Sequence, residues 1–187
     1  MTGKTHLTLD DSTPNSGQIH GQTARTMMSI ERRLEKMGLV LPQQAPRPAG
    51  IVLPFSLVRV VGERVAVSGH GPQTADGALT PFRGKVGRDI GQEEAVQLAR
   101  LVALAMLGSL ARALGDLDRI SAWVRVFGMI NAAPSFQQLS PVMNGFSDLI
   151  LELFGPEIGG HARTVVGVSE LPFDLPIEIE AEVQVRS

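Results

Sequence analysis

The chain contains no cysteine and no tyrosine, and aromatic residues make up only 4% of its 187 residues. Without cysteine, disulfide frameworks, thiolate nucleophiles and cysteine-bound metal sites are excluded. The formal net charge is −2, so the basic excess typical of nucleic-acid-binding proteins is missing. The few aromatic side chains also give no platform on which bases would stack. Composition therefore argues against thiol chemistry and against RNA or DNA as a partner.

Long apolar runs are missing as well. The longest spans residues 101–107, far short of the roughly 20 residues that cross a bilayer. The first twenty residues show no basic start followed by an apolar run, so we expect a cytoplasmic protein that does not bind membranes. The four histidines have no paired spacing such as His-x-x-x-His, and no phosphate loop or dinucleotide fingerprint occurs. We therefore expect no metal and no cofactor.

What the chain does have is an ordinary globular balance, with 43% hydrophobic and 19% charged residues, enough for one core. Residues 1–26 are polar and lack an apolar period, which predicts a flexible tail before a single domain over 27–187. A short helix should begin at a Ser29 cap and end at Gly38. The prolines within 41–54 predict an extended connector.

The remaining pattern predicts five strands and two long helices. We expect strands over 55–61 and 64–68 joined by a turn at 62–63, a helix over 92–114, a strand over 120–130, a helix over 141–154 capped by Ser140 and stopped by Gly155, and strands over 162–169 and 177–185. The order β-β-α-β-α-β-β predicts an α+β fold, a mixed β-sheet with two long helices packed on one face.

The C-terminal quarter carries the most specific motif. Ala-Arg-Thr at 162–164 opens a valine-rich strand, Leu-Pro follows at 171–172, and Ile-Glu-Ile-Glu-Ala occupies 177–181. This run resembles the signature of the RidA/YjgF family. Pro54-Phe55 and Val67-Ser68-Gly69 resemble the family's first hairpin, and Asn144 resembles its helix asparagine. The resemblance covers about residues 27–186, and the N-terminal helix and the segment 132–142 are similar to a longer subgroup.

The resemblance implies a chorismate-mutase-like fold, a homotrimer and clefts that lie between two subunits. It also implies an enzyme that hydrolyses reactive 2-imino and 2-enamino acids to 2-oxo acids and ammonia. Such a substrate is a small carboxylate that is already electrophilic, so the reaction needs no cofactor.

Two residues would carry the chemistry. Arg163, held rigidly at a strand start, can grip a carboxylate with two parallel hydrogen bonds, and the matching family arginine does so. Glu178 matches the family glutamate that positions or activates water. The resemblance further places the substrate against Phe55, Ser68, Gly69, Asn144 and Val165. Without it, Arg163 would be read as a surface ion pair and Glu178 as part of a solvated strand face.

The chain also departs from the family. Phe55 stands where the family usually has tyrosine, and Val165 where it often has cysteine, so a hydroxyl and a thiol are lost. These changes indicate a bulkier or more apolar substrate, or altered efficiency. His161 is a candidate for contact with the substrate or with a residue that holds it. A carboxylate-binding or regulatory trimer without turnover, and a biosynthetic enzyme for a larger imine, remain alternatives. The family's older ribonuclease label is disfavoured by charge.

Overall fold

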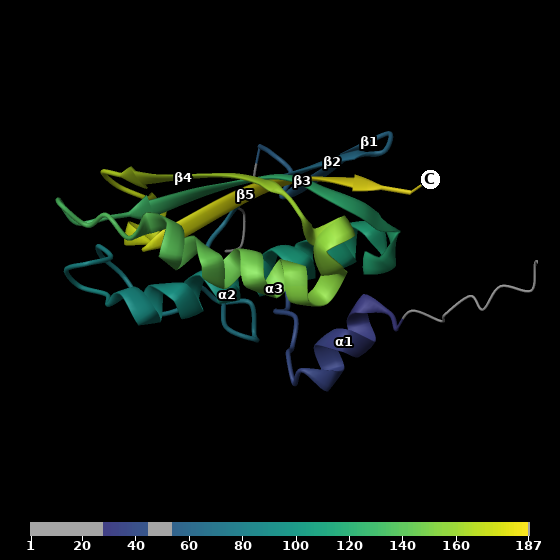
Figure 1. Cartoon of the computed structure of the whole chain (residues 1–187), viewed down its shortest axis with the longest axis horizontal. Coiled ribbons are helices and arrows are strands. Elements are labelled where there is room, and N and C mark those ends of the chain that lie inside the picture. The colour runs from purple at the N-terminus through teal and green to yellow at the C-terminus, as the bar shows by residue number, and fades with distance from the viewer. Residues whose placement is uncertain (1–27, 45–53, 187) are drawn as a thin grey trace, which may run out of the picture.

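The computed structural model describes residues 28–44 and 54–186 as one sheet with helices packed on one of its faces (Figure 1). The strands are β1 (Val58–Val61), β2 (Arg64–His70), β3 (Ile120–Asn131), β4 (Ala162–Val168) and β5 (Ile177–Val185); the helices are α1 (Ile30–Lys36), α2 (Gln92–Leu114) and α3 (Leu139–Gly159), with short 3-10 turns η1 (Leu117–Arg119) and η2 (Pro172–Asp174). The predicted element order and the α+β class are confirmed.

The sheet has the order β1-β2-β5-β3-β4. Of the strand pairs, only β3–β4 is parallel. Helix α3 lies between these two strands in the chain and carries it back, so that β4 runs in the same direction as β3. The other pairs are antiparallel, and β5 fills the space between β2 and β3. The last strand of the chain is thus central, while β4, which carries the Ala-Arg-Thr motif, is an edge strand.

The two faces of the sheet differ in character, as the alternation along β5 shows. Ile177, Ile179 and Val183 are fully buried toward the helices, whereas Glu178, Glu180 and Glu182 point the other way. We call this second surface the open face. In the part of the chain drawn as ribbon in Figure 1, α2 and α3 lie together on the side opposite the open face.

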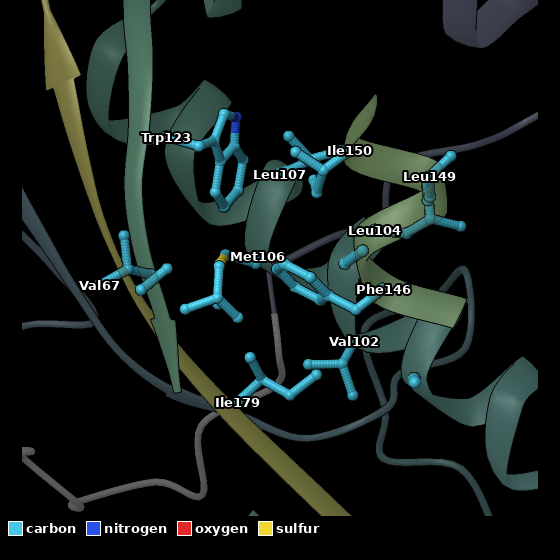
Figure 2. Packing of buried hydrophobic residues seen from close by; sticks show 14 of the residues in the cluster. Val67, Val102, Leu104, Met106, Leu107, Trp123, Phe146, Leu149, Ile150 and Ile179 are labelled. Carbon is cyan, nitrogen blue, oxygen red and sulfur yellow. The ribbon is translucent and has the colours of Figure 1, made fainter. Parts of the chain in front are cut away.

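The core lies between the sheet and the layer formed by α2 and α3. Trp123 of β3 packs edge-to-face against Phe146 of α3, with ring centroids 5.9 Å apart, and Figure 2 shows Leu107 and Ile150 beside them. Among the described residues α2 is long and apolar enough to span a membrane, but 67% of its apolar window is buried inside the protein. The apolar character of α2 is therefore explained by its burial in the core of the protein.

Close contact between α2 and α3 depends on Gly145. A Cβ atom at this position would lie 2.0 Å from the backbone oxygen of Val96 in α2. The absence of a side chain lets the two helix backbones approach, and this fixes the position of α3 above β3 and β4. This contact therefore also positions Asn144, the candidate site residue on α3.

Several predicted boundaries were wrong. Helix α3 begins at Leu139 after Gln138, so Ser140 lies in its first turn and is not the cap. Gly155 interrupts the helix with a left-handed φ of 74°, but a further turn continues to Gly159. Strand β2 does not stop at Ser68, because a bulge absorbs the next residue and pairing resumes between His70 and Ile179.

Further boundaries differ by a few residues at most. The first strand begins at Val58 rather than at 55, β3 extends one residue to Asn131, and β4 ends at Val168. The Ser29 cap is confirmed, since its hydroxyl accepts a hydrogen bond from the Arg32 N–H. The predicted tail over 1–26 and residues 45–53 of the predicted connector lie outside the described residues.

Candidate functional site

Arg163 lies near the start of β4 and turns its side chain toward α3. Its Nη1 donates to Asn144 Oδ1 at 3.0 Å and to Ser147 Oγ at 3.1 Å. Its Nη2 lies 3.5 Å from the carbonyl oxygen of Ser140, a long contact. Arg163 and Asn144, each predicted separately as a site residue, are thus brought into contact. The structure places Arg163 among neutral acceptors, not in the surface ion pair that a bare sequence would favour.

These contacts leave one edge of the Arg163 guanidinium uncommitted. Both N–H groups of Nη1 are used by α3, while Nε has no hydrogen-bond acceptor among residues 28–44 and 54–186. The Nε–H and one Nη2–H project in parallel from the same edge, the geometry that matches a carboxylate. The side chain is only partly buried, so this edge can reach a ligand.

Ser147 is a member of the cluster that the sequence prediction missed. It lies three residues after Asn144, so both side chains share one face of α3. Its Oγ also lies 2.9 Å from His161 Nε2, and His161 Nδ1 lies 2.7 Å from the carbonyl oxygen of Gly159. His161 therefore reaches Arg163 through Ser147. In the sequence, Ser147 could have been recognised by its position three residues after Asn144, which puts both side chains on one face of the helix.

A second group of predicted residues meets at the bulge in β2. Val67 pairs with Ala181 and His70 with Ile179, so three steps on β2 oppose two steps on β5. At this irregularity a Cβ atom on Gly69 would lie 1.9 Å from Glu178 Oε1. The Glu178 carboxyl group thus occupies the space that a side chain would fill, and Gly69 is needed for it to lie there.

Glu178 has altered acidity. Partial burial raises its pKa above the ordinary value of 4.5, and the charge of Glu180, two residues along the same strand face, raises it further. A carboxylate with a raised pKa is a stronger base than an ordinary surface glutamate. This is the property expected of a residue that takes a proton from water.

Ser68 and Phe55 flank the Gly69 bulge. Ser68 Oγ donates to the carbonyl oxygen of Ser56 at 2.8 Å, and its backbone N–H donates to Leu57 at 2.9 Å. These bonds hold the segment that carries Phe55 beside the bulge. The Phe55 ring is 55% exposed, so it offers an apolar surface without a hydroxyl.

Val165 lies two residues after Arg163 on the edge strand and pairs with Gly128 of β3. Its side chain is partly buried and packs against the core. A role for its main chain in substrate binding stays a prediction.

The two groups do not meet within one chain. Arg163 and Asn144 lie on the helix side at the β4 edge, whereas Glu178 and Gly69 lie on the open face, with β3 between their strands. Within one chain the sheet therefore lies between the Arg163 guanidinium and the Glu178 carboxylate.

Three other carboxylates come close together elsewhere, in Glu31, Asp116 and Asp118, with oxygens within 4.8 Å of one another. Each accepts a backbone N–H: Glu31 that of Leu117, Asp118 that of Ile30, and Asp116 that of Asp118. These bonds cap α1 and η1. The cluster is accounted for by capping and does not require a cation.

Comparison with known proteins identifies the family. A family model described as "YjgF/chorismate_mutase-like, putative endoribonuclease" matches residues 31–177. Protein TCP17 of Trypanosoma cruzi is 37% identical over 158 residues, which cover 84% of this chain and 95% of that protein.

Solved structures agree with this match. The crystal structure of the protein Atu1372 from Agrobacterium tumefaciens has a TM-score of 0.73 at 33% identity, covering 84% of this chain and 92% of that one. A protein of Shewanella oneidensis that carries the same endoribonuclease description has a TM-score of 0.75 at 28% identity, covering 84% and 100%. The fold is chorismate-mutase-like, and the chain belongs to the YjgF family, also called RidA, that its C-terminal motif predicts.

Proposed function

We propose that this protein hydrolyses 2-imino and 2-enamino acids to 2-oxo acids and ammonia in clefts formed between copies of the chain in a homotrimer. The observation that carries the proposal is the uncommitted Nε/Nη2 edge of Arg163. A guanidinium whose other nitrogen is held by Asn144 and Ser147 is pre-organised for a planar carboxylate. Binding there would place C2 of the substrate at a fixed distance from the cleft wall.

In this mechanism Glu178 of the adjoining copy accepts a proton from a water molecule. The water oxygen forms a bond to C2, and the π electrons of the C=N bond move to nitrogen. Protonation of that nitrogen by Glu178 gives a carbinolamine. Glu178 then takes the hydroxyl proton and delivers it to the amino nitrogen, so the C–N bond breaks, ammonia leaves and the C=O bond forms. The raised pKa of Glu178 makes its carboxylate a stronger proton acceptor than an ordinary glutamate, which suits these proton transfers. Arg163 withdraws electron density through the carboxylate and stabilises the developing charge.

The open face supports assembly from several copies. It carries exposed apolar residues beside paired charges: Val61 is exposed, Arg64 pairs with Glu182 at 2.8 Å, and Arg125 lies 5.6 Å from the Phe127 ring. A surface that mixes apolar side chains with internally paired charges is suited to packing against a second protein surface.

The second candidate is a trimer that binds a carboxylate metabolite without turnover. Phe55 favours it, because the ring provides a wall but no hydroxyl to hold water or ligand. RNA cleavage, the activity in the family description, fits less well. The net charge is −2 and a row of three glutamates crosses the open face along β5, which would repel phosphates.

The test generates 2-aminoacrylate from serine with a dehydratase and follows semicarbazide trapping of the imine. Native protein should shorten the lifetime of the trappable imine. Arg163→Ala should lower kcat/KM about tenfold to a hundredfold, the cost of a lost charge-assisted pair. Glu178→Gln should lower kcat. Arg100→Ala is the matched control, because among the described residues Arg100 forms only a surface pair, with Glu152 at 3.5 Å.

Longer and aromatic imino acids, made with an amino-acid oxidase, extend the panel. If native protein leaves every imine unchanged but binds 2-oxo acids through Arg163, the non-catalytic alternative replaces the hydrolase. Unchanged imine loss together with no carboxylate binding would reject both.

A further inference from the structure

Arg163 is the first member of a series of hydrogen bonds that runs away from the substrate side. Arg163 Nη1 to Ser147 Oγ is 3.1 Å, Ser147 Oγ to His161 Nε2 is 2.9 Å, and His161 Nδ1 to the oxygen of Gly159 is 2.7 Å. The series connects the edge strand to the last turn of α3.

The direction of every bond in this series is determined by chemistry. The Gly159 carbonyl can only accept, so a neutral His161 ring carries its proton on Nδ1 and leaves Nε2 as an acceptor. Ser147 must then donate its hydroxyl hydrogen to Nε2, which turns the lone pairs of Oγ toward Arg163, a group that can only donate. His161 thus sets the orientation of the Ser147 hydroxyl, and the hydroxyl sets the position of Nη1.

The surroundings restrict movement of these groups. Ser147 is 8% exposed and lies on the packed face of α3. The His161 ring stands perpendicular to the Phe146 ring, with centroids 6.5 Å apart, and Phe146 is itself held against Trp123. The contact with Phe146 and the bonds at both ring nitrogens favour this one orientation of the His161 ring.

We propose that His161 and Ser147 are positioning residues that hold the Arg163 guanidinium with its Nε/Nη2 edge directed at the substrate carboxylate. This inference rests on the proposed function, because it assigns these residues to carboxylate binding. Neither residue contacts the substrate. Asn144 shares Nη1 with Ser147, so loss of the series loosens Arg163 without releasing it.

Two substitutions of His161 separate the two ends of its ring. In His161→Asn the amide nitrogen can still donate to Gly159, but nothing remains to accept the Ser147 hydroxyl. In His161→Gln the longer amide can present its oxygen to Ser147. Binding of 2-oxobutyrate, an unreactive carboxylate, is measured by calorimetry, and KM and kcat are measured with the 2-imino acid panel. Thermal melting verifies that each variant is folded.

We expect His161→Asn and Ser147→Ala to weaken 2-oxobutyrate binding and to raise KM about tenfold, the loss of one well-placed hydrogen bond. The fall in kcat should be smaller, and His161→Gln should restore most of the affinity. Binding of the neutral amide of the same acid should respond to none of these changes. A merely structural histidine would affect both ligands, or melting temperature alone.

The outcomes distinguish this inference from the proposed function. If native protein binds 2-oxobutyrate and Arg163→Ala abolishes it, but His161→Asn and Ser147→Ala bind like native, the positioning role is overturned and the function stands. If the native protein binds no carboxylate, the proposed function fails, and the role of His161 fails with it. In folded variants, NMR of the Arg163 side chain gives a second reading: rotation about its Cζ–Nη bonds should quicken in His161→Asn and not in His161→Gln.

Discussion

At the scale of single residues, the environment of Glu178 makes a pH-dependent prediction. Burial and the neighbouring charge of Glu180 raise the pKa of Glu178 above 4.5, and the active form is the carboxylate. Activity should therefore be lost as pH falls through this raised pKa. Glu180→Gln removes the repulsion, lowers the pKa of Glu178 and should move the acid limb of the kcat profile to lower pH.

Glu182→Gln is the control for that shift. Glu182 lies on the same strand face but two residues farther from Glu178, and it pairs with Arg64. Its substitution should leave the acid limb in place. An acid limb that is identical in native protein and Glu180→Gln would mean that Glu178 is not the group titrating in the rate profile.

The residues of the candidate site differed in how far sequence could predict them. Arg163 and Asn144 meet as the motif implied, because a strand and the helix before it are close in the chain. Ser147 was missed, although its spacing from Asn144 was visible. The contact between Gly69 and Glu178 could not be derived, because it depends on a bulge that shifts the register of β2 against β5. Cross-strand register is set by packing, which local pattern does not reveal.

At the scale of elements, the β2 bulge is anchored from behind by His70, which is only 4% exposed. His70 Nδ1 donates to Ser68 O at 2.6 Å, and Nε2 accepts from Ser109 Oγ of α2 at 2.9 Å. Arg112 in turn donates to Ser109 at 3.1 Å and to Pro42 at 2.9 Å. The helix and the connector thus hold the strand distortion that places Gly69 under Glu178.

This arrangement predicts that the protein loses stability in mild acid. Burial lowers the pKa of His70, and the charge of Arg112 lowers it further, against the raising effect of the bond to Ser68. The unfolded chain, with a histidine near 6.5, takes up a proton at higher pH than the folded chain. Stability contributed by neutral His70 is therefore full above about 6.5 and declines as pH falls from there through the lowered folded-state value.

Denaturant melts between pH 7.5 and 5 measure this loss. His70→Asn keeps a donor for Ser68 but loses the acceptor for the Ser109 hydroxyl, so its free energy of unfolding at neutral pH should be lower by about 1 kcal/mol. The asparagine side chain also cannot titrate. The stability of this variant should therefore fall less steeply with acid than that of native protein. Parallel pH curves for the two proteins would show that another group causes the acid sensitivity.

At this scale the order of the elements was predictable from the sequence, and their boundaries were less so. The existence, type and order of the five strands and two long helices were predicted because hydrophobic periodicity is strong over long segments. The end of α3 was predicted wrongly, because glycine commonly ends a helix. Here the helix resumes after Gly155 for one more turn, and this turn brings the Gly159 carbonyl to His161. Tertiary contacts of that turn outweigh the local signal.

At the scale of the whole molecule, the sheet separates the two residue groups, and this bears on the proposed trimer. Arg163 faces α3 at the β4 edge, and Glu178 faces the open side of a central strand. A closed ring of identical subunits can bring the edge of one chain to the open face of the next, and each interface then repeats the same site. Family resemblance implies shared clefts, and the separation of the two groups on one chain is the structural observation on which the proposed trimer rests.

Subunit mixing tests this reason directly. Arg163→Ala and Glu178→Gln chains, each of low activity alone, should regain activity when unfolded and refolded together, because a cleft with Arg163 from one chain and Glu178 from its neighbour can be intact. Random assembly of equal amounts should restore about one quarter of native activity. The same two proteins mixed after folding, without subunit exchange, should stay at this low activity. If the co-refolded mixture is also of low activity while native protein refolds fully, both residues serve the same cleft from one chain, and the sheet does not divide them as the fold implies.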